Sequence, residues 1–170
     1  MPLTVPAEQP DEVEAHVIVG GYGRSGKAAA SVLKAARVPL MAVELNHPVF
    51  GDLRASGVPG VWGDITSPDI LHAAQIEKAR VLLLTMPDPN TIALSVDHAR
   101  QANPEIAVVA RAVQEHHVEE LRKLGVDAII QPEFEGGIEM VRQALVRYRC
   151  DDATTARLTA AIRDEFYGKA

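Results

Sequence analysis

A glycine-rich turn carries the strongest chemical signal in this sequence. The run Gly21-Tyr22-Gly23-Arg24-Ser25-Gly26 directly follows an apolar stretch, residues 16–20, and opens a helical segment. Between a strand and a helix, Gly21 permits a tight turn, Gly23 lets the main chain approach a pyrophosphate, and Gly26 lets the helix pack closely on the strand. The N–H groups of the helix N-terminus then face phosphate oxygens, with Arg24 as a further candidate contact. The alternative is a glycine turn that binds nothing.

Glu44 is the second candidate ligand group. It ends the next apolar stretch, residues 40–44, and lies eighteen residues beyond Gly26. An acidic residue at this distance from such a turn accepts hydrogen bonds from ribose hydroxyls, and its charge repels a 2′-phosphate. The sequence therefore favours NAD(H), or a mononucleotide such as AMP, ADP or ATP, over NADP. A solvated glutamate at a strand end is the alternative.

Polar residues also follow the third, fourth and fifth apolar stretches. Asp64 either accepts from an adenine amino group or caps the helix that begins near residue 67. Arg111 either faces an anion or pairs with a neighbouring carboxylate. Because the carboxyl ends of parallel strands share one edge of a sheet, we expect these loops to open onto the same crevice. The other candidates on them are Ile65, Thr85, Met86, Asp88 and Asn90.

Six short apolar stretches must position these residues. Most are continuously apolar, which is typical of strands covered on both faces; they span residues 16–20, 40–45, 60–62, 81–85, 106–110 and 128–130. Five helix-length segments alternate with them, at 25–36, 48–56, 67–74, 90–102 and 115–124. This alternation predicts an α/β fold, a Rossmann-type doubly wound parallel six-stranded sheet with right-handed crossovers. Another open α/β fold, such as a flavodoxin-like one, is the alternative.

The two ends of the chain differ from this pattern. Residues 1–15 are acidic and rich in proline, and we expect a flexible leader or linker ahead of a nucleotide-binding domain at 16–150. Residues 134–148 have a helical pattern, and a last helix within 151–170 is marked by Leu158, Ile162 and Phe166. No strand remains for these extra C-terminal helices to cross over to, so they either pad the sheet or meet a partner subunit.

Composition narrows the function classes. A chain of 170 residues fits one domain, and its net charge of −6 argues against a nucleic-acid partner. No stretch is long and apolar enough for direct membrane insertion, and the one cysteine, Cys150, has no second cysteine to pair with. The six histidines show no metal-ligand spacing, so we predict no metal site. We expect a cytoplasmic protein.

A small Rossmann-fold enzyme is the alternative function, but parts are missing. A dehydrogenase needs a second domain or long insertions to hold its substrate, and a short-chain reductase needs a lysine four residues after a tyrosine. None of Tyr22, Tyr148 and Tyr167 has one. A SAM-dependent methyltransferase shares the acidic residue after the second strand, but it usually has glycine at the position of Ser25 and ends in an antiparallel hairpin. We therefore predict no catalytic residues and no enzymatic activity.

The candidate residues, taken together, resemble a known family. With Gly63-Asp64, Ala110-Arg111-Ala112 and Pro132-Glu133-Phe134-Glu135-Gly136, they match in order and spacing the RCK or KTN domain, the Trk-type nucleotide-binding domain that regulates potassium channels and transporters. The similarity covers about residues 16–149. The stretch Phe134-Glu135-Gly136 makes the chain most similar to the cytosolic domain of Kef-type cation:proton antiporters.

This resemblance implies a non-catalytic homodimer that binds NAD(H) or an adenine nucleotide. Ligand occupancy would shift the pose of the two subunits and so bias a potassium or monovalent cation transporter or channel, attached or separate, at the cytoplasmic face of the inner membrane. The family's nucleotide-holding positions match Gly21, Gly23, Gly26 and Glu44, and its residue near the adenine matches Asp64. Two departures stand out: Pro87 and Pro89 flank Asp88, where the family often has an acidic pair, and Val113 replaces the second arginine of the glutathione-gated proteins.

Overall fold

The sheet in the computed structural model, which describes residues 13–168, has six parallel strands in the order β3-β2-β1-β4-β5-β6. The order reverses between β1 and β4, which makes the carboxyl ends of these two strands the point where a crevice opens. The strands are β1 (Val17–Gly20), β2 (Leu40–Glu44), β3 (Gly60–Trp62), β4 (Val81–Leu84), β5 (Ala107–Arg111) and β6 (Ala128–Ile130).

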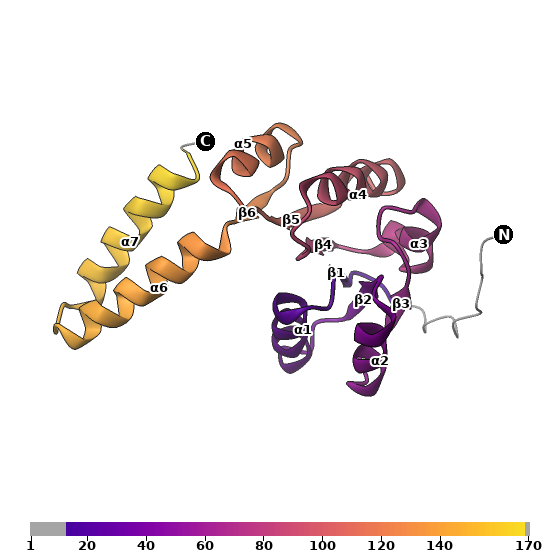
Figure 1. The fold of residues 1–170 in the computed structure, drawn as a ribbon, viewed down its shortest axis with the longest axis horizontal. Helices are drawn as coiled ribbons and strands as arrows, with labels where there is room; N and C mark the ends of the chain where they lie inside the picture. Colours follow the sequence, from indigo (N-terminus) through magenta and orange to yellow (C-terminus); the bar gives the residue numbers. More distant parts are fainter. Residues whose placement is uncertain (1–12, 169–170) are drawn as a thin grey trace.

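Helices cover both faces of this sheet. Figure 1 shows α1 and α2 on one face and α3, α4 and α5 on the other. They span α1 (Arg24–Ala35), α2 (His47–Ala55), α3 (Pro68–Ala73), α4 (Pro89–Ala102) and α5 (Glu115–Lys123), with a short 3-10 helix, η1 (Ile76–Lys78), before β4. Alternate strand residues point to the two faces. Ile18 and Met41 therefore pack under α3 and α4, while Val19 and Ala42 pack under α1 and α2.

The predicted Rossmann-type doubly wound fold is confirmed. Each predicted strand and helix is present, with ends shifted by a residue or two: Thr85 lies outside β4, whereas Arg111 belongs to β5. Local chemistry sets several helix ends, since Asp88 caps α4 by accepting from the main-chain N–H of Thr91 at 2.7 Å. Gly57 and Gly125 follow α2 and α5 with positive φ angles of 69° and 70°, as a left-handed C-terminal turn requires.

The predicted leader falls almost entirely on residues 1–12, which lie outside the described residues. The described chain starts with two hydrogen bonds to the region around η1. The main-chain N–H of Val13 donates to Gln75 Oε1 at 3.1 Å, and that of Ala15 donates to the Lys78 carbonyl at 2.9 Å. The segment just before β1 is therefore anchored at the amino edge of the sheet, opposite the crevice.

The last two helices form a hairpin that projects from the sheet. Figure 1 shows α6 (Pro132–Arg147) and α7 (Asp152–Phe166) lying antiparallel and extending away from the strands. The predicted apolar face is largely open: Val141, Leu158 and Ile162 are each more than 40% exposed. On α7 the buried residues are Thr155 and Thr159 instead. Most of the hairpin therefore does not pad the chain's own sheet, and only Phe166 and Tyr167, at the end of α7, pack against the core.

Candidate functional site

The glycine turn packs tightly against the start of the loop that follows β4. Gly21 has a φ of +85°, and a Cβ there would lie 2.9 Å from Thr85 Oγ1. The Thr85 hydroxyl lies within hydrogen-bond distance of the carbonyl oxygens of Gly20 and Gly21, at 2.9 and 3.1 Å, and donates to them, which holds the turn in place. Thr85 thus supports the turn through its side chain.

Gly23 and Gly26 differ sharply in their surroundings. A Cβ on Gly26 would lie 2.0 Å from the carbonyl oxygen of Gly21, so the packing of α1 itself requires glycine there. A Cβ on Gly23 would meet nothing within 4 Å. Gly23 is the N-cap of α1, it supplies no capping side chain, and the first turn holds no acidic residue. Arg24 and Ser25 are exposed in that turn, so its N–H groups border open space.

Glu44 joins the glycine turn to the start of α2. Its Oε2 accepts from the main-chain N–H of Tyr22 at 2.7 Å, and its Oε1 accepts from that of Asn46 at 2.6 Å. Each carboxylate oxygen keeps a further lone pair for a hydroxyl donor. The side chain of Tyr22 points the other way: it is 5% exposed, and its hydroxyl lies 3.0 Å from Ser56 Oγ. Tyr22 can therefore reach a ligand only through its main chain.

The loop after β3 brings Asp64 to the same edge but turns Ile65 inward. Asp64 Oδ1 accepts from the main-chain N–H and the hydroxyl of Thr66, at 2.9 and 2.7 Å. Thr66 precedes Ser67, the N-cap of α3, so Asp64 closes the turn before the helix and the predicted capping of α3 is not seen. Asp64 is exposed and retains Oδ2 for another donor. Ile65 is 5% exposed and lies beneath Gly20, whose added Cβ would come 2.5 Å from it. An apolar residue here completes the core, which leaves only its main chain for a ligand.

Asp88 and Asn90 stand at the start of α4, after the partly buried Met86. The hydroxyl and main-chain N–H of Thr91 hold the pKa of the Asp88 carboxyl below its usual value, so this cap is charged at neutral pH. Asn90 is exposed within the first turn of α4. Asp88 therefore has a structural task here, whereas the side chain of Asn90 makes no hydrogen bond within the described residues.

Arg111 is a guanidinium without a partner. Within residues 13–168 it makes no hydrogen bond or ion pair, and its Nε is buried and unsatisfied. It alternates along β5 with the buried Val108 and Ala110, which pack under α4 and α5, so its side chain lies on the opposite face. Leaving a cation unpaired is costly, which makes Arg111 a strong candidate for contact with an anion.

Two residues at this edge were not predicted. Leu45 follows Glu44 and is 63% exposed, an apolar surface beside the carboxylate. Trp62 ends β3 in register with Glu44, and its indole Nε1 donates to the Leu45 carbonyl at 3.0 Å. Both belong to apolar stretches, which the sequence pattern assigns to the core. Only their position at the very end of a strand distinguishes them.

The edge thus carries acceptors at β2, open N–H groups at β1 and a cation at β5. A ligand with hydroxyl donors next to a phosphate would match the acceptors at β2 and the N–H groups at β1.

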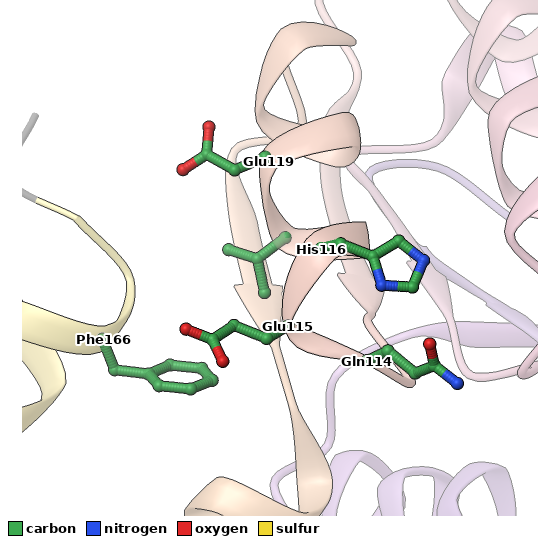
Figure 2. A pocket seen from close by; sticks show the side chains of 6 residues that line it. Gln114, Glu115, His116, Glu119 and Phe166 are labelled. Carbon is green, nitrogen blue, oxygen red and sulfur yellow. The ribbon is translucent and has the colours of Figure 1, made fainter.

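A separate hollow of about 570 Å³ lies between α5 and the end of α7 (Figure 2), lined by Gln114, Glu115, His116, Val118, Glu119 and Phe166, none of them a predicted site residue. The described part of the chain contains no group of three or more metal-ligating side chains, and none of its helices is long and apolar enough to cross a bilayer.

The family model of the TrkA-N domain matches residues 17–132 of this chain. The chain belongs to the TrkA-N family. The match contains the glycine turn, Glu44, Asp64 and Arg111, so it covers the whole crevice edge of the sheet. The resemblance inferred from the sequence is confirmed.

This TrkA-N domain is similar to part of a much longer curated protein. It is 31% identical to the putative K(+) efflux antiporter KefB of Alkalimonas amylolytica, over 79% of this chain but 20% of the antiporter. Among solved structures, the TrkA-N domain of the inner membrane protein YbaL from Escherichia coli is 30% identical, with a TM-score of 0.73 over 78% of this chain and 98% of that one.

Two more distant structures share the fold of this TrkA-N domain. The Kef C-terminal domain of Shewanella denitrificans in its AMP-bound form is 22% identical, with a TM-score of 0.72 over 89% of this chain and 92% of that one. The GsuK channel bound to NAD is 18% identical, with a TM-score of 0.69 over 76% of this chain and 24% of that one.

Proposed function

We propose that this TrkA-N domain is a regulatory module that binds NAD(H) or an adenine mononucleotide and thereby controls a membrane potassium or monovalent cation transporter. The observation that carries the proposal is the open space at Gly23, where the N-terminus of α1 meets the Glu44 carboxylate. Amide donors would hold the phosphate and Glu44 the ribose hydroxyls. The AMP bound to the Kef domain and the NAD bound to GsuK support both ligand classes.

The two ligand classes would use different lengths of the crevice. A mononucleotide would occupy the half between Asp64, Glu44 and the glycine turn. A dinucleotide would continue toward β4 and β5, where Arg111 offers an unpaired cation to its second half. We favour NAD(H) because it would engage Arg111 as well, and we expect NADP to bind poorly because its 2′-phosphate would face Glu44.

Regulation rather than catalysis fits the chemistry of this edge. Asp64 and Asp88 both accept hydrogen bonds from hydroxyl and main-chain donors of their own loops, so each has a structural task at this edge. The matched antiporter is described as a K(+) efflux protein and YbaL as an inner membrane protein. We therefore place this module at the cytoplasmic face of the inner membrane, attached to or bound by a cation transporter.

A ligand screen tests the proposal directly. At 100 times its Kd, a nucleotide adds about 2.7 kcal/mol of stability, which raises the Tm of a domain of this size by roughly 5–11 °C. We expect such a rise with NADH, NAD or AMP and little change with NADP, measured by thermal shift. The chain's one tryptophan, Trp62, hydrogen-bonds beside Glu44 and should report the same binding by fluorescence. A response to S-adenosylmethionine alone, or to none of these compounds, would contradict the proposal.

We also propose that the module is a homodimer joined through the α6–α7 hairpin. Large apolar side chains project from the hairpin into solvent, and a patch of this kind marks an interface; they are Met140, Val141, Val146, Tyr148, Leu158 and Ile162. Gly136 and Gly137, early in α6, have nothing near their Cβ positions, although glycine costs helix stability. Close approach of a second α6 would explain both glycines.

Val141→Glu should separate the dimer without unfolding the chain. Val141 is 45% exposed on α6, so a charge there is harmless to one chain but would be buried in the proposed interface. Light scattering should give about twice the chain mass of 18.3 kDa for the unaltered protein and one chain mass for the variant. Val32→Glu, on the exposed surface of α1, is the matched control and should remain dimeric. A dimeric Val141→Glu protein would place the interface elsewhere.

A further inference from the structure

Gln131 is a buried polar residue at which three segments of the chain meet. It lies between β6 and α6 and is 8% exposed. Its side-chain Nε2 donates to the carbonyl of Val113 at 3.1 Å, and its Oε1 accepts from the main-chain N–H of Phe134 at 2.5 Å. Its own main-chain N–H donates to the hydroxyl of Tyr167, beyond the end of α7, at 3.1 Å.

Every polar group of Gln131 is used. Its Nε2 also donates to Glu133 Oε2 at 2.9 Å, and its carbonyl accepts from the main-chain N–H of Glu135 at 3.0 Å. A buried amide with all its bonds made fixes the segments it joins, because breaking one bond leaves an unpaired polar group inside the protein. Gln131 therefore joins three segments at one point: the loop after β5, the start of α6 and the end of α7.

Aromatic rings and an ion pair join α6 to the end of α7 next to Gln131. Phe134 stacks on Phe166 with ring centroids 3.8 Å apart, and the Tyr167 hydroxyl donates to Glu135 Oε1 at 3.1 Å. Glu135 also pairs with Arg163 of α7 at 2.8 Å. Burial raises the pKa of Tyr167, so its hydroxyl stays a donor. Figure 2 shows Phe166 reaching from α7 toward the first turn of α5.

Gln131 is linked directly to the crevice edge of the sheet. Val113, whose carbonyl Gln131 holds, is two residues past Arg111, and the N–H of Ala112 between them donates to the Ile130 carbonyl at 2.8 Å. A ligand anion that draws the unpaired Arg111 guanidinium toward itself would pull on this same segment. Within one chain the rest of the hairpin extends away from the sheet (Figure 1), so its direction relative to the sheet is set at this base.

We propose that Gln131 is the positioning residue that transmits ligand binding at the crevice edge to the α6–α7 hairpin, with Tyr167 as its counterpart on α7. This inference rests on the proposed function. Two changes break the link. Gln131→Glu keeps the oxygen that caps α6 but replaces the donor to Val113 and Glu133 with an acceptor that repels both. Tyr167→Phe removes only a hydroxyl.

Hydrogen exchange of the α6 and α7 amides, with and without saturating AMP or NADH, tests this link while calorimetry measures affinity. In the unaltered protein we expect the ligand to change hairpin exchange by at least about threefold, the measure of a shifted local opening equilibrium. In Gln131→Glu and Tyr167→Phe we expect that change to vanish, with affinity within about threefold because neither side chain borders the crevice. Gln143→Ala, on the exposed face of α6, is the control and should keep the full response.

The outcomes separate the two proposals. If neither nucleotide binds the unaltered protein, the proposed function is wrong and this inference falls with it. If a nucleotide binds but the hairpin does not respond, or if both variants respond as the unaltered protein does, ligand binding stands and the role of Gln131 is overturned. Loss of affinity in both variants would also overturn it, because the residues would then support the site itself.

Discussion

Gly26→Ala should destabilise the whole domain, whereas Gly23→Ala should leave it folded and weaken its binding of the nucleotide. The added methyl group at residue 26 would lie 2.0 Å from the Gly21 carbonyl oxygen, main chain that cannot give way cheaply. Overpacking of this kind costs about 3 kcal/mol or more, a Tm fall of roughly 6–12 °C in a domain of this size.

At residue 23 the same methyl group meets only solvent in the free protein. We expect its Tm to fall by about 2–4 °C, since alanine is a poorer N-cap than glycine by about 1 kcal/mol. The phosphate would lose charge-assisted bonds to the amides of the turn, a loss of about ten- to a hundredfold in nucleotide affinity. Thermal unfolding and calorimetry on both variants check this. Full affinity in Gly23→Ala would show that no phosphate approaches the turn, and equal Tm losses would show that residue 23 is not open.

Glu44→Gln should lower both the affinity for the ligand and the stability of the fold. The carboxylate accepts from the main-chain N–H groups of Tyr22 and Asn46 at 2.7 and 2.6 Å, and an amide can offer an acceptor to only one of them. The other donor is left without its bond, at a cost of about 1–3 kcal/mol. Ribose hydroxyls would also lose a charged acceptor, which should lower NAD(H) or AMP affinity by about ten- to a hundredfold.

Glu105→Gln, an exposed change just before β5, is the matched control and should alter neither quantity. Glu44→Arg adds a test of specificity, because a cation there should favour NADP over NAD. Chemical unfolding and calorimetry with both dinucleotides would measure these effects. If Glu44→Gln kept full affinity, the ribose would have to lie elsewhere, even if the stability loss were found.

The fold was predictable because its strands are continuously apolar and its turns carry glycine. The edge that carries the candidate residues followed from topology, since the carboxyl ends of parallel strands meet there. Which side chains face the crevice was not predictable from spacing. Tyr22 and Ile65 lie in the loops but are buried, because the core beneath the turn needs their apolar surface. Leu45 and Trp62 are the reverse case, apolar residues left at the surface.

The hairpin shows a different limit. Leu158 and Ile162 have the spacing of a packed helix face, yet Thr155 and Thr159 are the buried residues of α7. Apolar periodicity reveals that a surface needs covering but not which molecule covers it. The short helix η1 was missed for a local reason: Gln75 before it adopts a φ of +58°, which a sequence signals only when glycine or asparagine stands there.

Glu44 has two roles, since it holds main-chain amides of the fold and is assigned to the ribose of the ligand. Gly23 has only one role, which is to leave room for the phosphate. In a descendant that had abandoned its nucleotide, folding would still preserve the acidic residue, while position 23 would be free to drift toward any small polar side chain. Retention of the carboxylate is therefore poor evidence that a related sensor still works, and the fate of one glycine is the better record of which lineages kept their effector.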